Sequence, residues 1–309
     1  MKYTACRIFY STTVKSIPNY DELINEHNGV LPFEFLIVRN SNVIMSTIIN
    51  RAYYLYTNEK MQFRAGRQKN NWGINTTWNL NDHFNIYNFD YEEREDAVRI
   101  TYLPNYISSF DIASKFTDDW KTGVISALYK FNRLNYDFQF LMGKFYRKTS
   151  VCKDREGSIK NMVFKGKLIF FKPCDSNGSM NTSFSTSLDY SLKNRNYLTM
   201  NYLYNSSGSN KLSDTENSIF NSPNTEYPIP AKHTIMESAS YMGSPIFSSS
   251  LINVYNFGIR CLTITPLATF SVMNNLDLDI IGQFFWQEFG TRSFQNIGNG
   301  ICRRFKLSF

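Results

Sequence analysis

The feature that most limits how this chain can fold is a strict alternation of apolar and polar residues over long segments. Between Phe184 and Lys193, for example, Phe184, Leu188 and Tyr190 share one parity, whereas serines and an aspartate occupy the other. Successive side chains of a β-strand point to opposite faces, so this pattern predicts strands with one apolar face and one polar face. The same pattern recurs in 276–288 and across most of the chain. The chain is therefore predicted to be all-β.

The length of the alternating segments separates two kinds of β protein. Strands of globular proteins are usually about 5–6 residues long, whereas strands that cross a bilayer need about 9–11. The segments in this chain run to about 10–14 residues, which favours the second kind. We therefore expect an antiparallel up-and-down transmembrane β-barrel with about 14 strands, in a range of about 12–16. The expected strands are 43–57, 60–68, 96–103, 107–116, 120–132, 136–148, 159–172, 180–193, 195–206, 232–242, 248–256, 259–273, 276–288 and 300–309.

The connections between these segments differ in length. Short turns are expected at 193–195 and 274–275, and long polar connections at 69–95 and 206–231. Short turns on one rim and longer loops on the other are typical of outer-membrane barrels. With about 14 strands, counting back from Phe309 places the 69–95 connection on the same side as the C-terminus, which is expected to face the periplasm.

The composition agrees with a strand-rich chain and excludes some partners. Aromatic residues make up 16% of the 309 residues, with 26 Phe and 20 Tyr, and such residues favour strands. No run of about 18 apolar residues is present, which excludes an ordinary transmembrane helix but not a barrel. The net charge of +7 is scattered along the chain rather than gathered in a basic run, so no nucleic-acid partner is expected.

Cysteine and histidine usage indicates neither a metal site nor an enzyme. The five cysteines are far apart and form no CxxC pair, so we expect no metal, no disulfide framework and no cofactor. The only histidines are His27, His83 and His233, and only His83 has suitable polar neighbours. No GxSxG or HExxH motif is present, so we expect no catalytic activity.

The last ten residues, GICRRFKLSF, alternate in polarity and end on an aromatic side chain. Phe305, Leu307 and Phe309 share one parity, and a final aromatic suits the interfacial girdle of a closing strand. This ending resembles the assembly signal of Gram-negative outer-membrane proteins. The resemblance implies that these three residues form the signal that the outer-membrane assembly machinery reads.

Two further stretches resemble porin-like outer-membrane barrels of Bacteroidota type, with a distant similarity to alginate-export barrels. The first is NRAYYLYTNEKMQFRAGRQKNNWGINTTWNLNDHFNIYNFDYEERE, in which a strand leads into G-R-Q, N-W-G and N-x-N-D-x-F-N. The second, ITPLATFSVMNNLDLDIIGQFFWQEFGTRSF, fits the last hairpin of that group. The resemblance covers 50–309. It implies a cell outer membrane location, the lipid bilayer as partner, and a porin-like channel for passive or weakly selective diffusion of small hydrophilic solutes.

The start of the chain departs from this pattern. Its first residues, MKYTACRIFYSTTVKSIPNY, lack the continuous apolar core of a secretory signal. We expect 1–40 to be an N-terminal segment, a periplasmic remnant of a longer protein, and 41–309 to form the barrel. Three interpretations stay open: a signal that has been removed, a reading frame that begins inside a longer gene, or a cytosolic protein.

The 69–95 connection is the candidate for a pore constriction. It is too long for a tight turn and too aromatic for a disordered linker, so it is expected to fold over a mouth or into the lumen. Basic and acidic side chains on opposite sides would create a transverse field. The candidates are Arg64, Arg67 and Arg99 opposite Asp90, Glu92 and Glu93. The alternative is that these charges only solvate a rim.

The tryptophans of this connection have two interpretations. Trp72 and Trp78, together with Phe309, are candidates for the interfacial aromatic girdle, because amphipathic rings suit the boundary between water and membrane. The alternative for Trp72 is packing under a loop.

Two other functions stay open beside the channel. The Ser/Asn-rich connection 206–231 favours a surface scaffold or adhesin built on a barrel. The missing signal favours a soluble β-sandwich or ligand-carrying barrel, whose strands should be shorter and whose one face should be buried in a core. The oligomeric state stays open too.

Overall fold

The computed structural model describes residues 4–10, 34–39, 43–49, 51–68, 70, 72, 95–116, 123–145, 147–174, 179–192, 195–210, 229, 231–289 and 293–307. Within these ranges the chain is all-β and antiparallel, as the alternation predicts. Within these ranges there is no helix that is long and apolar enough to cross a membrane.

Fifteen strands form one large sheet in which every strand pairs with its neighbours in sequence, from β4 to β18. This is the expected up-and-down order, and the count lies within the expected range. Strands β8 to β18 are 10 to 15 residues long, as the alternating segments predict. The strands are β4 (Ala52–Thr57), β5 (Met61–Gln68), β6 (Glu95–Asn105), β7 (Ser108–Lys115), β8 (Val124–Arg133), β9 (Tyr136–Phe145), β10 (Lys148–Ile159), β11 (Met162–Pro173), β12 (Asn181–Ser191), β13 (Asn196–Asn205), β14 (His233–Ser244), β15 (Phe247–Asn256), β16 (Cys261–Met273), β17 (Leu276–Phe289) and β18 (Ser293–Leu307).

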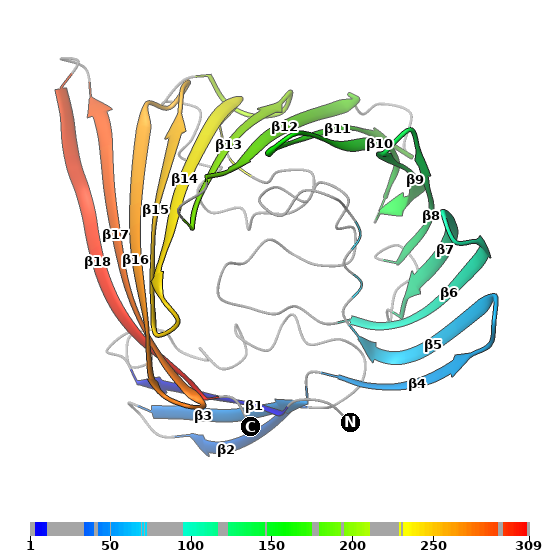
Figure 1. Ribbon diagram of the computed structural model, residues 1–309, viewed down its shortest axis with the longest axis horizontal. Helices are drawn as coiled ribbons and strands as arrows, with labels where there is room; N and C mark the ends of the chain where they lie inside the picture. The colour runs from blue at the N-terminus through cyan, green and yellow to red at the C-terminus, as the bar shows by residue number, and fades with distance from the viewer. Residues whose placement is uncertain are drawn as a thin grey trace.

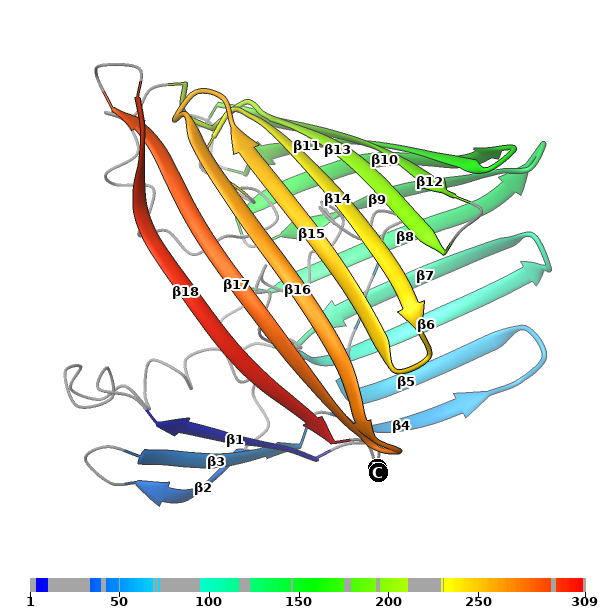
Figure 2. The ribbon, with the colours of Figure 1, turned by 60° about the vertical axis from the view of Figure 1, so that its left-hand side comes forward.

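The large sheet curves round into an open ring (Figure 1). Its edge strands β4 and β18 do not pair with each other in the described part of the chain. A second sheet of three strands has the order β1-β3-β2, with β1 (Thr4–Tyr10), β2 (Glu34–Arg39) and β3 (Val43–Ile49). In both views this small sheet lies on the open side of the ring, next to the C-terminal end of β18 (Figure 2).

The small sheet divides one expected strand in two. The segment 43–57 is predicted as a single strand, but β3 ends at Ile49 and pairs with β1 and β2, whereas β4 begins at Ala52 and pairs with β5. In the sequence the break coincides with two successive polar residues, Asn50 and Arg51, which interrupt the alternation between two apolar stretches. The pairing of β1 with β3 also joins residues on both sides of the expected domain boundary at residue 40.

Strand β10 is missing from the predicted strands, which left 149–158 as a connection. Its outward side carries Lys153 and Arg155, so the strand has no apolar face and its alternation is hidden. With β10 included, thirteen strands (β6 to β18) rather than twelve follow the 69–95 connection. An odd number of strands places that connection at the end of the sheet opposite Leu307. The prediction that it shares a side with the C-terminus is therefore wrong.

The two ends of the large sheet carry different connections. The end that holds Leu307 has tight turns throughout, including 134–135, 160–161 and 274–275, and we call it the short-turn end. At Leu134 and Asn135 the backbone has φ values of 54° and 62°, as a two-residue hairpin turn of the right twist requires. The opposite end carries the connections 69–94 and 206–232, and we call it the long-loop end.

Candidate functional site

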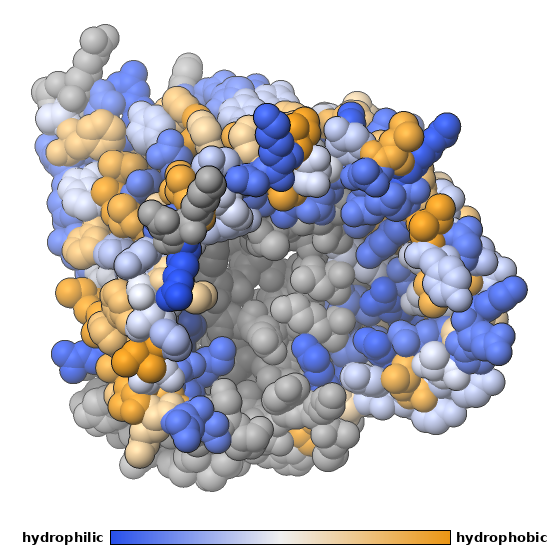
Figure 3. All heavy atoms as spheres, in the orientation of Figure 1, coloured by the Kyte–Doolittle hydropathy of each residue, from blue (hydrophilic) through white to orange (hydrophobic). Residues whose placement is uncertain are grey.

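The two faces of the large sheet are reversed relative to a water-soluble protein. Side chains on the concave face, which we call the inner face, are mostly buried although many are polar, such as Ser185 at 0% exposure and Asp154 at 1%. Side chains on the convex, outer face are apolar and exposed, such as Phe164 at 50% and Met200 at 49%. Figure 3 shows the hollow of the ring and apolar residues along its outer rim beside β15–β18. This matches the alternation read from the sequence, in which the serines of 184–193 oppose its aromatic and leucine residues.

Strand register aligns the inner-face residues of β8–β11 in rows, and the three rows nearest the short-turn end differ in chemistry. Of these three, the row farthest from the short-turn end is apolar. The middle row carries two lysines and an aspartate, and the row nearer the short-turn end carries two acids and a lysine. From β8 to β11 the rows are Leu128–Leu141–Cys152–Ile169, Lys130–Gln139–Asp154–Lys167 and Asn132–Asp137–Glu156–Lys165.

The apolar row belongs to a core that lies inside the ring rather than between two sheets. Its members are Trp72, Ala113, Val124, Leu128, Leu141, Phe145, Cys152, Ile169, Phe171 and Leu203. Most of them lie in the half of each strand next to the long-loop end. The sequence predicts a hydrated interior along the whole strand, but this half of the inner face is packed with apolar side chains.

Ion pairs connect neighbouring strands across the charged rows. The Lys165 Nζ lies 3.1 Å from Asp189 Oδ2 on β12 and 3.8 Å from Glu156 Oε1 on β10. Lys167 Nζ lies 3.6 Å from Asp154 Oδ2. A similar pair at the other side of the sheet joins Arg304 to Asp279, which also accepts a hydrogen bond from Thr269. Each of these three basic groups faces an acid, so their charges are largely neutralised within the inner face.

The inner face of β12 carries polar groups with unused hydrogen-bonding capacity. The hydroxyls of Ser183, Ser185 and Ser187 are 0–2% exposed and have no hydrogen-bond partner among the residues that the structure describes. The amide of Asn201, opposite Ser187 on β13, is also unpartnered. Buried polar groups normally pair because an unmade hydrogen bond is costly, so these groups call for a partner beyond the described residues, from water, a solute or another part of the chain.

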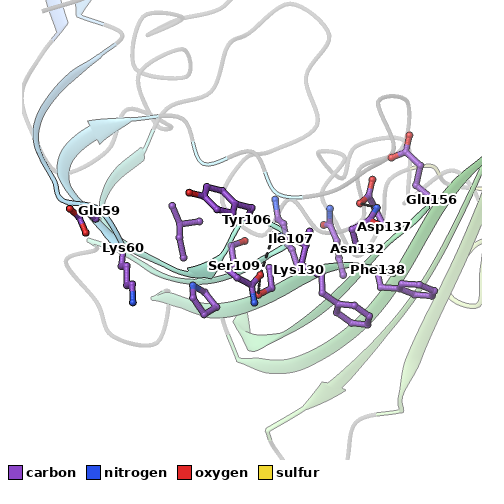
Figure 4. Close-up of a pocket in the computed structure, with 16 residues that line it drawn as sticks. Glu59, Lys60, Tyr106, Ile107, Ser109, Lys130, Asn132, Asp137, Phe138 and Glu156 are labelled. Atoms are coloured by element: carbon purple, nitrogen blue, oxygen red, sulfur yellow. Dashed lines mark hydrogen bonds between the residues drawn. The ribbon is translucent and has the colours of Figure 1, made fainter. Parts of the chain in front are cut away.

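A cavity of about 1010 Å³ lies on the inner side of β6–β10, at the short-turn end. Figure 4 shows Asn132, Asp137 and Glu156 pointing into it, with Phe138 directed to the other side of the sheet. Asn132 donates a hydrogen bond of 2.8 Å to Asp137. Lys130 also lines this cavity, so the space is bordered by charges of both signs.

The three arginines of the expected constriction do not act as one group. Arg64 and Arg99 are cross-strand neighbours on the inner face, whereas Arg67 has the opposite parity. Arg67 forms a buried two-point pair with Asp96, with both contacts at 3.0 Å. Arg99 donates to Asp111 at 2.9 and 3.0 Å. Arg64 stacks on the side chain of Tyr53 on the inner face of β4, with its guanidinium 4.8 Å from the centroid of the Tyr53 ring.

The acids expected to oppose these arginines lie outside the described residues, as do Trp78 and Phe309. Whether Asp90, Glu92 and Glu93 face the arginines therefore stays a prediction. Neither Asp96 nor Asp111 was among the sequence candidates. The cross-strand pairing of Arg67 with Asp96 follows from register, which the sequence alone did not provide.

Trp72 takes the packing role rather than the girdle role. It is 0% exposed, belongs to the inner apolar core, and lies under the guanidinium of Arg99 at 5.9 Å. Phe305 is 66% exposed on the outer face of β18, where an interfacial ring would lie. Leu307 pairs with Leu276 at the short-turn end.

The described residues contain little that resembles catalytic machinery. His233 lies on the outer face, where its Nδ1 is 2.8 Å from the hydroxyl of Tyr202. Within the described ranges no group of three His, Cys, Asp or Glu side chains could hold a metal ion. In the described part of the chain, Cys152, Cys174, Cys261 and Cys302 form no disulfide, and the Cys152 thiol donates a hydrogen bond of 3.1 Å to Asp154 Oδ1.

The fold is similar to that of solved porin structures. OccAB4 of Acinetobacter baumannii matches with a TM-score of 0.55 at 8% identity, over 81% of this chain and 71% of its own. A BenF-like porin from Pseudomonas fluorescens Pf-5 matches with a TM-score of 0.54 at 9% identity, over 83% and 77%. OccK10 (OpdN) of Pseudomonas aeruginosa matches with a TM-score of 0.54 at 10% identity, over 86% and 84%. The chain therefore has a porin-like β-barrel fold.

The similarity is detected in structure and not in sequence. No protein-family model matches the chain, and no curated protein matches its sequence.

Proposed function

We propose that this chain is a porin-like channel of the bacterial outer membrane that lets small hydrophilic solutes diffuse through. The observation that carries the proposal is the reversal of the two sheet faces. An exposed apolar convex face suits contact with lipid, and a polar concave face with a cavity suits the passage of solutes. The similarity of the fold to that of a BenF-like porin supports the same function.

The charged side chains of the inner face support weak rather than strong selectivity between cations and anions. Lysines of the inner face pair with acids on neighbouring strands, as Lys165 does with Asp189 and Lys167 with Asp154. Paired charges leave a small net field, so neither cations nor anions are strongly favoured. The unpartnered hydroxyls of β12 favour solutes that form hydrogen bonds.

The narrower relationships proposed from the sequence remain part of this proposal. They are membership of the Bacteroidota-type group, with its distant similarity to alginate-export barrels, and recognition of the C-terminal Phe305, Leu307 and Phe309 by the outer-membrane assembly machinery. Residues 1–40 are proposed as a segment distinct from the barrel at 41–309.

The constriction proposal now depends mainly on Arg64. Arg99 is already paired with Asp111, and Arg67 with Asp96 on the opposite parity. Among the described residues Arg64 has no acidic partner: its Nη2 donates to Gln62 Oε1 at 3.3 Å and its Nε has no hydrogen-bond partner. Glu92→Gln/Glu93→Gln is expected to shift ion selectivity if these acids face the lumen. Unchanged selectivity would leave them as rim charges.

Single-channel recording tests the proposal as a whole. The refolded, detergent-purified chain is added to a planar lipid bilayer, and stepwise increases in current are expected. A control is heat-modifiable gel mobility, which reports a folded barrel. A chain that shows the mobility shift but gives no current steps would contradict the channel.

A non-transporting scaffold is the second candidate. The connection that favours it, 206–231, joins β13 and β14 at the long-loop end, but only its first and last residues lie among those described. A two-layer sandwich is not what the chain forms, because β4–β18 make one continuous sheet. Folded protein without conductance would favour the scaffold over the channel.

A further inference from the structure

We propose that the outer face of β9 and β10 binds the phosphate of an anionic lipid headgroup, through Lys153 and Arg155. The inference rests on the proposed membrane location of this face. Both cations point outward, because the intervening Asp154 and the following Glu156 point to the inner face. Lys153 and Arg155 are exposed, on a face whose other side chains are mainly apolar.

Aromatic rings of the neighbouring strand hold both cations. Lys153 pairs in register with Phe140, and its Nζ lies 5.7 Å from the centroid of that ring. Arg155 lies 4.3 Å from the ring centroid of Tyr136 and 5.8 Å from that of Phe138. A cation over an aromatic face is attracted by the ring quadrupole, so the two charged groups are positioned before any ligand arrives.

The rings continue as a platform across three strands. Phe110 on β7 stacks on Tyr129 of β8 with centroids 4.3 Å apart, and Tyr129 lies 5.3 Å from Phe131. Phe131 in turn stacks on Phe138 of β9 at 5.2 Å. Aromatic side chains concentrate where the bilayer meets water, so this platform marks the level of the headgroups.

The position of Arg155 along the strand agrees with that level. Arg155 lies four residues before Ile159, the last residue of β10, which is about 13 Å along the strand at about 3.3 Å per residue, and Lys153 lies two residues further from that end, about 20 Å. Long basic side chains extend toward the interface while their stems cover apolar surface. The headgroups of the leaflet on the short-turn side are therefore within reach.

Charge selects the chemical class of the ligand. On the outward positions of β8–β12 the described residues include no Asp or Glu, so neither cation has a protein counter-charge there. A guanidinium presents a planar set of donors that matches phosphate, and a nearby ammonium adds a second charge. The apolar neighbours Phe164 and Leu168 on β11 suit acyl chains, which a free phosphate lacks.

Native mass spectrometry of the detergent-solubilised full chain tests this proposal. The protein is titrated with phosphatidylglycerol, with zwitterionic phosphatidylcholine as the comparison lipid of no net charge, and with inorganic phosphate as competitor. The wild type is expected to retain phosphatidylglycerol preferentially. Lys153→Gln/Arg155→Gln is expected to lower that affinity about 30-fold, since each cation near an anionic surface contributes about 1 kcal/mol. Arg303→Gln, which removes an outward cation on β18, should leave it unchanged.

The outcomes separate the site from the function on which it rests. Equal retention by the wild type and the double variant overturns the site even when both proteins conduct ions. Displacement of the lipid by inorganic phosphate at equal concentration also overturns it, because it indicates a site for free phosphate. Should the double variant fail to show the mobility shift of a folded barrel, Lys153→Gln and Arg155→Gln alone answer the question, each with an expected loss of about 5-fold. A chain that retains the lipid but gives no current contradicts the channel and supports the site.

Discussion

On the inner face, the carboxylate of Asp154 lies 3.6 Å from the ammonium of Lys167, and the two side chains are 1% and 3% exposed. Removing one member of such a pair leaves a buried charge without its partner, so Asp154→Ala should lower the free energy of unfolding by about 3–5 kcal/mol. Asp154→Leu/Lys167→Met removes both charges and should cost far less. Urea unfolding in lipid vesicles measures both. Equal losses in the two variants would show that charge pairing is not what stabilises this contact.

The backbone at Gly66 predicts a second destabilising change. Its φ of 121° is a conformation that L side chains rarely adopt, and a Cβ there would lie 2.5 Å from the carbonyl oxygen of Ala52. We expect Gly66→Ala to cost about 1–3 kcal/mol of stability. The matched control is Gly166→Ala in β11, where the nearest heavy atom to a Cβ is 3.7 Å away. A melting comparison that ranks the two variants equally would contradict this explanation.

Two adjacent isoleucines on β17 test which face meets lipid. Ile280 is on the outer face and 39% exposed, whereas Ile281 pairs with Cys302 on the inner face. Arginine facing lipid at mid-membrane costs about 2–4 kcal/mol, so Ile280→Arg should destabilise the folded barrel in vesicles by that amount. Ile281→Arg, one residue further on, should cost less because its side chain is on the inner face, between Asp279 and Gln283 of the same strand. The reverse order would mean that the faces have been assigned wrongly.

The cavity at the short-turn end predicts an effect on selectivity. Asp137 and Glu156 both line it, so Asp137→Asn/Glu156→Gln removes two negative charges from the solute path. The ratio of chloride to potassium permeability, obtained from the reversal potential in a salt gradient, should rise. Glu237→Gln is the control, because Glu237 lies on the outer face opposite Met200. A shift of the same size in the control variant would remove the cavity from the conduction path.

Most of the fold could be predicted from the sequence because a strand's period of two is a local property. The parity of Phe184 and Ser185 was enough to assign one to the exposed outer face and the other to the buried inner face. Failures occurred where the local pattern contains little signal. Strand β10 was not predicted because Lys153 and Arg155 occupy its outer face, and the break between β3 and β4 was not predicted because only the short polar pair Asn50-Arg51 separates two apolar stretches.

The candidate site could be predicted less well, because its contacts cross strands. Arg99 was a sequence candidate, but its partner Asp111 became visible only once β6 and β7 were in register. Trp72 was equally suited to a girdle and to a core until the structure buried it completely.

By itself, the sequence determined that the chain is all-β, that its strands are long, and which side chains share a face, because strand geometry assigns each residue a side without reference to any other strand. Only the tertiary structure decided which charges meet, where the interior is apolar, and at which end the 69–94 connection lies. Those properties depend on the number of strands and on their register. Every strand that lies between two residues therefore affects whether the two residues meet.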